Sequence, residues 1–418
     1  MALGAAEIAA AVQAGELDPR ESIERALARG EERPDLNAFI TLCTEQAMAR
    51  AQECVDGPLA GVPLLVKDVF DTAGVRTTAG SRLYAERVPA SSAPAVLALE
   101  AAGAIVIGKT NCDEFAWGVT GQNHFYGDAR NPTLAGRITG GSSSGNASAL
   151  AAEIAPLALG TDTGGSVRMP AGCCQLVGMK PRLGALPMEG VFPLCPSFDT
   201  VGPMARTAKD CALCYEVLAG ERPPQREVKG VRVGVLTAMP PLGPSGPVPE
   251  RDERAGEFAA RLEDLGMQAE EVALPVPGAD IWPVFYSEAA ATHGETFPAR
   301  REEYGPIVRA KLDSAQNIDQ EAVAAGRRAL QAWRLQAQTE PPVELFVAPT
   351  LGVREIPPGD VDELEIRIAF SAYTRVFSFL GWPAIAMGGV QLAAREEGLL
   401  FAAALAWEVA FGARRVLR

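Results

Sequence analysis

The chain has 418 residues, of which 48% are hydrophobic and 22% are charged, and its formal net charge is −14 at pH 7. These values are typical of a globular protein with a large core, and the acidity argues against nucleic acid as the main partner, because binding phosphates needs clustered Lys and Arg. No run of about 18 apolar residues is free of charges and breakers, and the N-terminus lacks a basic-then-apolar signal, so we expect a cytoplasmic protein without a membrane partner.

Helix and strand patterns alternate through the first half of the chain. Helices are predicted at 5–12, 18–28 and 92–102, and strands at 37–41, 62–66 and 104–107. In the second helix Asp18 is the expected N-cap, Pro19 takes the first helical position and Glu21 completes a capping box. The strand at 104–107 follows a helix and is entirely apolar, as buried strands are. This order predicts an α/β arrangement.

The second half continues in the same way after a stretch rich in proline and glycine. Strands are predicted at 231–236, 267–274, 345–348 and 384–387, and a charged amphipathic helix at 249–265. The strand–helix–strand order at 231–274 indicates a parallel unit on the flank of a larger sheet. Residues 288–338 are mostly helical and charged, and we expect them to cover one face.

Cysteine and histidine usage limits the chemistry. Eight cysteines are scattered over the chain and only two histidines occur, whereas a disulfide framework belongs to small secreted chains. Cys211 and Cys214 have CxxC spacing, but 207–219 has a helical pattern and no second pair follows, which favours core packing. With so few ligands available, we expect no metal and no cofactor.

Two glycine-flanked turns that carry serine bracket an apolar run in the middle of the chain. The first is Gly140-Gly141-Ser142-Ser143-Ser144-Gly145, and the second is Gly160-Thr161-Asp162-Thr163-Gly164-Gly165-Ser166. Glycine lets other groups approach closely, and a neighbouring base can turn a serine hydroxyl into a nucleophile. The run at 147–159 predicts a buried helix between the turns, so we expect a catalytic floor rather than flexible linkers.

The first turn matches GxSxG, which would make Ser143 the nucleophile of an α/β-hydrolase. That motif needs a preceding strand, whereas residues 131–139 contain a proline and turn residues. It also needs a histidine further along the chain, and only His293 qualifies. A Ser-His-Asp esterase is therefore the less favoured alternative.

A lysine is the other base that can activate a serine, provided that burial or a nearby cation lowers its pKa. Lys67 ends the apolar run at 62–66, which indicates a buried stem. A head group in water at the end of a strand is the alternative, and composition alone favours neither.

Several segments around these residues resemble the amidase signature family of serine hydrolases. They are 61–63 with Lys67 and Asp68, 108–116, 140–143, 160–168 with Pro170, 178–181 and 199–203. The resemblance implies the α/β amidase-signature fold, with a large mixed central sheet covered by helices on both faces. It also implies a single domain of residues 1–418, with its core at 57–210 and a helical, variable cover at about 285–340.

The resemblance further implies a Ser–cis-Ser–Lys triad. Ser166 would be the nucleophile that forms an acyl-enzyme, Ser142 the bridging serine after a cis peptide bond from Gly141, and Lys67 the base. Neutral Lys67 would take a proton through Ser142 as Ser166 attacks an amide carbonyl.

The surroundings of the implied nucleophile follow from the same resemblance. The expected oxyanion hole consists of the backbone N–H groups of Thr163, Gly164, Gly165 and Ser166. Asp162 and Arg168 are expected to tie this loop down. Phe115 and Trp117 are expected to line the acyl side of the substrate pocket, with core packing as the alternative for both.

The chain departs from the family pattern in two places. Ser144, Gln175 and Arg182 replace residues that are usually Gly, Gly and Thr. Near the C-terminus, Gly389 passes directly to Val390, where the family usually has a longer loop. Part of the substrate funnel is therefore expected to differ.

The implied activity is hydrolysis of the carbon–nitrogen bond of a small carboxamide by a stand-alone amidase. The alternative is the glutaminase A subunit of a tRNA-dependent amidotransferase, which passes ammonia to a partner. Residues 109–115 resemble that subunit, whereas 306–328 resemble generic amidases more. The expected partner is accordingly a small-molecule amide, with no direct contact to nucleic acid, and a homodimer is left open.

Overall fold

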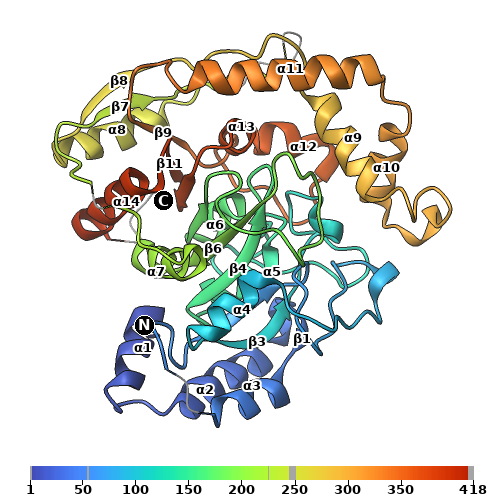
Figure 1. Ribbon diagram of the computed structural model, residues 1–418, viewed down its shortest axis with the longest axis vertical. Coiled ribbons are helices and arrows are strands. Elements are labelled where there is room, and N and C mark those ends of the chain that lie inside the picture. Colours follow the sequence, from blue (N-terminus) through green and yellow to red (C-terminus); the bar gives the residue numbers. More distant parts are fainter. Residues whose placement is uncertain (1, 54–55, 225, 244–250, 413–418) are drawn as a thin grey trace.

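Eleven strands form one mixed sheet in the order β1-β3-β2-β4-β6-β5-β10-β11-β9-β7-β8. The computed structural model describes residues 2–53, 56–224, 226–243 and 251–412 (Figure 1). The strands are β1 Phe39–Leu42, β2 Pro63–Lys67, β3 Ile105–Thr110, β4 Leu157–Asp162, β5 Val177–Lys180, β6 Thr200–Ala205, β7 Arg232–Val235, β8 Gln268–Glu271, β9 Leu345–Pro349, β10 Ala384–Met387 and β11 Val390–Ala394. The α-helices are α1 Ala5–Gln13, α2 Pro19–Glu32, α3 Thr44–Ala51, α4 Pro94–Ala101, α5 Ser144–Ala151, α6 Arg168–Cys174, α7 Ala208–Ala219, α8 Arg254–Asp264, α9 Trp282–Thr292, α10 Pro306–Ala315, α11 Gln320–Ala337, α12 Glu363–Phe370, α13 Ala372–Leu380 and α14 Glu397–Phe411.

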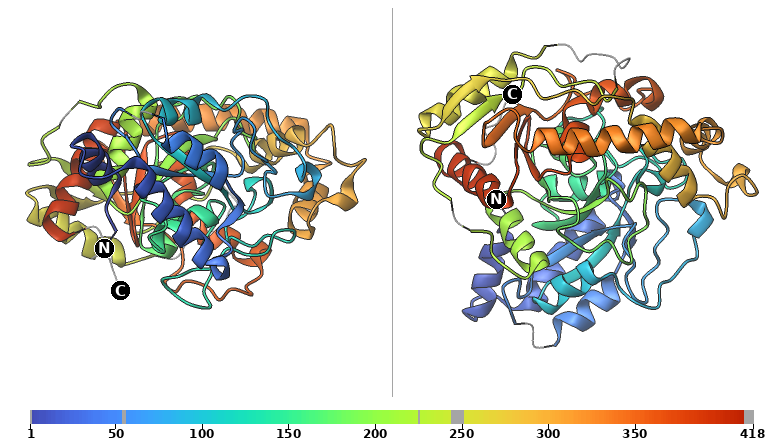
Figure 2. Two further views of the ribbon diagram at one scale, coloured as in Figure 1. Left: turned by 90° about the horizontal axis from the view of Figure 1, so that it is seen from below. Right: turned by 45° about the horizontal axis from the view of Figure 1, so that its top comes forward.

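The two faces of the sheet belong to two hydrophobic cores. Successive side chains of a strand point to opposite faces. In β2, Leu64 and Val66 therefore enter one core with α4, α7 and α14, whereas Leu65 enters the other with α2, α3 and α5. Helices cover both faces of the sheet (Figure 2), which confirms the predicted fold class.

Parallel pairing near one end of the sheet brings two functional segments to one edge. Strand β2 pairs in parallel with β3 on one side and with β4 on the other. The carboxyl ends of these strands therefore lie side by side. Strand β2 ends at Lys67, and β4 ends at Asp162, shortly before Ser166. The sheet itself thus sets the spacing between the candidate base and the candidate nucleophile.

The C-terminal half extends the sheet and covers it. Strand β7 pairs in parallel with β8, the last strand of the sheet, which confirms the flanking strand–helix–strand unit. The predicted helix at 249–265 begins partly outside the described residues and is seen as α8. Helix α11 runs along the top of the molecule in Figure 1, with α9 packed against it and α10 against α9, so the segment at 288–338 is mostly helical as predicted.

The apolar run at 147–159 is not the single helix that its composition predicts. Helix α5 ends at Ala151 and strand β4 begins at Leu157, with Pro156 between them. A proline cannot continue the helical hydrogen bonds, and it disfavours a helical residue before it. Every residue of β4 is buried, and apolar content alone does not separate such a strand from a buried helix. Ser166 therefore follows a strand.

Candidate active site

Lys67 lies at the end of β2 with its side chain completely buried. Its Nζ donates hydrogen bonds to Ser142 Oγ at 2.8 Å and to Thr161 Oγ1 at 2.9 Å. Burial removes the hydration of the charged amine and lowers the pKa of Lys67 to about 8, although the Cys112 thiol and three aspartates oppose this shift. The head group is therefore not in water, and the alternative of an ordinary strand-end lysine is wrong.

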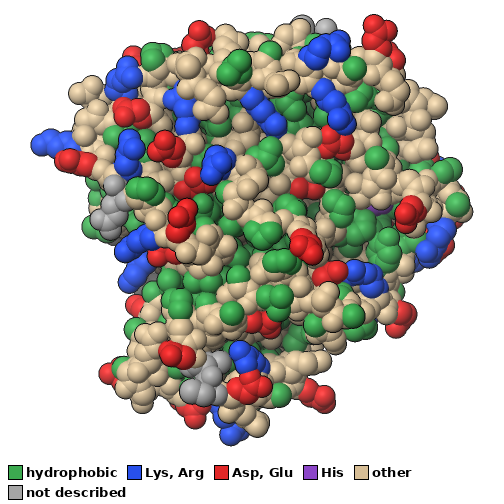
Figure 3. All heavy atoms as spheres, in the orientation of Figure 1, with side chains coloured by type: hydrophobic (Ala, Val, Ile, Leu, Met, Phe, Trp, Pro, Cys, Tyr) green, Lys and Arg blue, Asp and Glu red, His purple; other side chains and the backbone are tan. Residues whose placement is uncertain are grey.

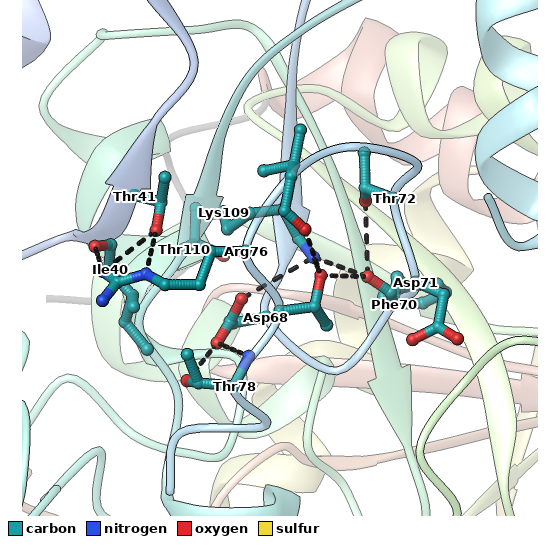
Figure 4. Close-up of polar contacts among 12 residues, drawn as sticks. Ile40, Thr41, Asp68, Phe70, Asp71, Thr72, Arg76, Thr78, Lys109 and Thr110 are labelled. Atoms are coloured by element: carbon teal, nitrogen blue, oxygen red, sulfur yellow. Dashed lines mark hydrogen bonds and ion pairs between the residues drawn. The ribbon is translucent and has the colours of Figure 1, made fainter. Parts of the chain in front are cut away.

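A second buried lysine holds the end of β2 in place (Figure 4). Lys109 of β3 donates to the Phe70 carbonyl at 2.5 Å and lies 3.6 Å from Asp68 Oδ1. The other oxygen of Asp68 accepts hydrogen bonds from the Thr78 N–H at 2.8 Å and from its hydroxyl at 2.5 Å. Because Asp68 follows Lys67 directly, these contacts fix the strand end from which Lys67 projects.

A cis peptide bond joins Gly141 to Ser142, at the position that the family resemblance implies. Ser142 is fully buried, and its hydroxyl accepts the hydrogen bond from Lys67. A Cβ at position 141 would lie 2.4 Å from Asp113 Oδ1, so only glycine fits beside that buried carboxyl group. The packing around Asp113 thus requires the glycine that precedes the bridging serine.

Ser166 follows β4 through a turn that a buried ion pair holds together. Asp162 accepts hydrogen bonds from the Gly165 N–H at 2.8 Å and from two guanidinium nitrogens of Arg168 at 3.0 Å. Burial disfavours the carboxylate, but Arg168 outweighs it and keeps the pKa of Asp162 below its ordinary value. Asp162 and Arg168 therefore tie the loop down, as expected. The Ser143 N–H donates to the Ser166 carbonyl at 3.1 Å, which brings the two serine turns together.

One of the four predicted oxyanion donors is already in use. The Gly165 N–H donates to Asp162, so a bound oxyanion would have to share it. Gly165 has a φ of +133°, and a Cβ on it would lie 2.2 Å from Thr374 Oγ1, so this position needs glycine. Thr163, Gly164 and Ser166 line the wall of a cavity.

The cavity in front of Ser166 has a volume of about 80 Å³ and a largely aromatic wall. Trp117 lines it, as predicted. The other aromatic residues of the wall are Trp282, Phe285, Tyr286 and Phe379, and the cationic ones are Lys311, Arg367 and Arg375. The cavity is thus mainly apolar, with a few charged groups that can orient a ligand, as small-molecule sites commonly are.

Phe115 is not part of this cavity, and for this residue the pocket prediction needs correction. Its ring packs against Tyr84 and His293, with ring centroids 6.0 Å and 4.6 Å away, in a buried aromatic cluster. The backbone is left-handed at both Phe115 and Ala116, and this turn separates the neighbouring rings of Phe115 and Trp117. Core packing, the alternative considered for both residues, describes Phe115.

The esterase alternative finds no support in the structure. His293 lies in the same aromatic cluster, and burial lowers its pKa to about 4. Its Nδ1 lies 3.2 Å from the Tyr304 hydroxyl, and no serine is among its contacts in the described part of the chain. The segment before Ser143 forms no strand beyond an isolated bridge at Arg137. The nucleophile elbow is therefore not formed.

Three features near the site have no role predicted from the sequence. Thr161 accepts a hydrogen bond from Lys67, although it lies within a motif that the sequence singles out. Lys311 and Glu363 form a buried ion pair whose lysine lines the cavity. Arg375 lies in α13, for which no helix is predicted. The signal that would have found it is a charged residue within the otherwise uncharged segment at 368–394.

Other predictions concern sites away from the serines. Cys211 and Cys214 are buried in α7, as core packing requires. Over the described ranges, no group of His, Cys, Asp or Glu side chains is arranged to hold a metal ion. None of the described helices is both long and apolar enough to cross a membrane.

Comparison with known proteins places the chain in a family. The sequence model of the Amidase family matches residues 21–399. A solved amidase structure is 31% identical with a TM-score of 0.85, and the match covers 98% of this chain and 99% of that one. A solved 6-aminohexanoate cyclic dimer hydrolase, complexed with substrate, is 26% identical with a TM-score of 0.86, over 99% and 97% of the two chains.

Curated relatives carry a more specific name, that of the A subunit of glutamyl-tRNA(Gln) amidotransferase. The relative from Symbiobacterium thermophilum is 42% identical over 299 residues, and the one from Deinococcus radiodurans is 41% identical over 292 residues. Each match covers 65% of this chain, but only 61% and 60% of the relatives. The matched region thus spans about three fifths of the length of these relatives.

The expectation of a small-molecule partner without nucleic acid is wrong in the light of these relatives. They are named as one subunit of an enzyme specific for a glutamyl-tRNA. Net charge describes the average surface of one chain, and an acidic subunit can share an assembly with RNA through other subunits, so the charge of −14 excludes less than expected. The family match and the shared fold lead to one conclusion: this chain belongs to the amidase signature family and is a hydrolase of amide carbon–nitrogen bonds.

Proposed function

We propose that Ser166 attacks the amide carbonyl of the substrate while Ser142 passes its proton to neutral Lys67. The observation that carries this proposal is the buried hydrogen bond of 2.8 Å between Lys67 Nζ and Ser142 Oγ, one residue from the backbone contact with Ser166. Run in reverse, the same relay protonates the leaving amine, which is needed because an amide anion is a poor leaving group. Water then hydrolyses the acyl-enzyme on Ser166.

The tetrahedral intermediate needs donors for its oxyanion. We assign this role to the N–H groups of Thr163, Gly164 and Ser166, with that of Gly165 shared with Asp162. Donors held in place by the fold stabilise a developing charge without reorganising, and they act most strongly where water is excluded. The ion pair between Asp162 and Arg168 supplies that rigidity.

The substrate that we propose first is the side-chain amide of glutamine, with the chain serving as the A subunit of a tRNA-dependent amidotransferase. The support is the name shared by relatives that are 38–46% identical. On the face in Figure 3, Lys and Arg side chains are interspersed with Asp and Glu. The phosphates of a tRNA would then be bound mainly by other subunits. Such a role agrees with the predicted cytoplasmic location.

A second candidate is hydrolysis of a small carboxamide by the chain alone. The observation in its favour is coverage, because the solved amidase matches 98% of this chain and 99% of its own length. The relatives from the tRNA-dependent enzyme match only about three fifths of theirs. The aromatic wall of the cavity, with Trp117, Trp282 and Phe285, suits an apolar acyl group.

Ammonia release from glutamine separates the two candidates. The chain is purified alone and together with the other amidotransferase subunits of its source, and ammonia is measured with and without glutamyl-tRNA. If the chain belongs to such a complex, we expect weak activity alone and roughly tenfold or greater stimulation by the other subunits, the size of typical coupling between sites. Full amidase activity of the lone chain that the other subunits leave unchanged would reject the first candidate and favour the second.

The pH dependence of hydrolysis tests the role of Lys67. Burial lowers the pKa of Lys67 to about 8, and only the neutral amine accepts a proton. We therefore expect kcat/KM to rise with pH up to about 8, and to fall about tenfold per unit below it, as for a single essential base. A profile that stays flat on the acid side, with the fold monitored by circular dichroism at each pH, contradicts a neutral-lysine base.

A further inference from the structure

The cavity that contains Ser166 is lined by cations but by no carboxylate. Its charged lining residues are Lys311, Arg367 and Arg375, and no Asp or Glu is among the described residues of its wall. This is unusual for a chain with a net charge of −14. The local charge is therefore of the opposite sign to the charge of the whole molecule.

The three cations differ in how well they are neutralised. Lys311 forms a buried ion pair with Glu363 and donates to the Trp117 carbonyl at 2.6 Å. Arg367 is only half-buried and donates to the Leu364 carbonyl of its own helix. Arg375 remains, and it has no carboxylate partner among the described residues.

Arg375 is a buried guanidinium with unused hydrogen-bonding capacity. The residue is 4% exposed, and its Nη1 donates to the Ile368 carbonyl at 2.7 Å. Its Nε has no hydrogen-bond partner in the described part of the chain. The guanidinium carbon lies 5.4 Å from the centre of the Trp282 ring, which also lines the cavity.

An unpaired guanidinium in this position calls for an anion. Burial lowers the pKa of Arg375 only to about 10, so it is charged at neutral pH. A buried charge without a partner is costly, and buried polar groups without partners are rare in native proteins. The planar fork of arginine matches a carboxylate better than any other common group does.

We propose that Arg375 binds a carboxylate of the substrate, so that the site prefers carboxamides that carry a carboxylate away from the bond to be cleaved. This inference rests on the proposed function of Ser166, because both residues line the same cavity. It applies to glutamine and equally to simpler ω-carbamoyl carboxylates. It makes Arg375 a specificity-determining residue rather than part of the bond-breaking machinery.

A pair of matched amides tests the proposal. Glutaramate has the carboxylate, and pentanamide has a methyl group in its place, and ammonia release is measured for both. We expect Arg375→Met to lower kcat/KM for glutaramate roughly 10- to 100-fold, as for a lost hydrogen bond to a charged group, and to leave pentanamide nearly unchanged. Arg375→Lys should recover part of the loss. Arg328→Met, which removes an exposed positive charge on α11, is the matched control and should alter neither rate.

Binding provides a readout that does not depend on turnover. Calorimetric titration of the Ser166→Ala protein with glutaramate should show an affinity that Arg375→Met weakens by the same factor, while thermal unfolding shows that the variant is folded. Equal losses for both amides, or unchanged or undetectable glutaramate binding in both titrations, overturn the proposal. The proposed function fails separately, if Ser166→Ala retains turnover.

Discussion

Ser166→Ala is expected to abolish amide hydrolysis while the fold stays intact. The substitution removes the only atom that forms the acyl-enzyme in the proposed mechanism, and the loss of kcat should be at least about 10⁴-fold, the order found when a hydrolase loses its nucleophilic serine. The backbone contact between Ser143 and Ser166 uses the main chain, so it survives the change. Steady-state ammonia release and thermal unfolding of both proteins measure the two effects.

Ser143→Ala is the matched control, because GxSxG would assign the nucleophile to that residue. Its hydroxyl is buried and has no hydrogen-bond partner among the described residues, so removing it should cost little stability. We expect near-normal turnover in this variant. A fluorophosphonate label should modify Ser166 in the unaltered protein and in Ser143→Ala. Labelling of Ser143, or undiminished turnover of Ser166→Ala, refutes the assignment.

Lys67→Met should lower kcat about 10²- to 10⁴-fold, the range for loss of a general base, without lowering Tm. Folding places the amine where its pKa falls from 10.5 to about 8. At pH 7 this burial disfavours the folded state, and the penalty fades only as the pH rises from about 8 towards 10.5. Removing the amine therefore offsets the hydrogen bonds lost by Ser142 and Thr161. Normal kcat in this variant would place the base elsewhere.

Lys109→Met makes the contrast clear, because Lys109 is equally buried but is paired with Asp68. Its loss leaves a buried carboxyl group without its cation, which should lower the free energy of unfolding by about 3–5 kcal/mol. Urea unfolding of the two lysine variants, together with kcat, separates the base from the structural lysine. A stable Lys109→Met protein would show that the Asp68 pair does not hold the end of β2.

The sequence predicts those parts of the fold where local pattern and tertiary packing agree. Strand β2 is found because its apolar run is bounded and ends in Lys67. The run at 147–159 is misassigned because a buried helix and a buried strand share one composition, and only Pro156 marks the junction. Strand β6 is not predicted, since Gly202 and Pro203 in its middle are residues that usually weaken strands. Its pairing with β4 and β5 overrides that preference.

The site shows the same limit at the level of single side chains. The motif residues Lys67, Ser142 and Ser166 can be named from sequence because glycine and serine patterns are local. Phe115 and Trp117 are nearly adjacent and chemically alike, yet one enters the core and the other the cavity. A left-handed turn between them decides this, and no residue pattern reveals it. Arg375 reaches the cavity only through the packing of α13.

The elements that form the cavity wall differ in their connection to the reacting groups. Helix α13 is tied to the nucleophile turn, because the Thr374 hydroxyl donates to the Gly164 carbonyl at 2.8 Å and Arg168 donates to Ser378 at 2.6 Å. Helix α9 supplies Trp282, Phe285 and Tyr286 to the wall, but none of the described hydrogen bonds joins it to that turn. Substrate range can therefore evolve through α9 while the catalytic geometry is conserved. Directed evolution for new amides has its natural library there.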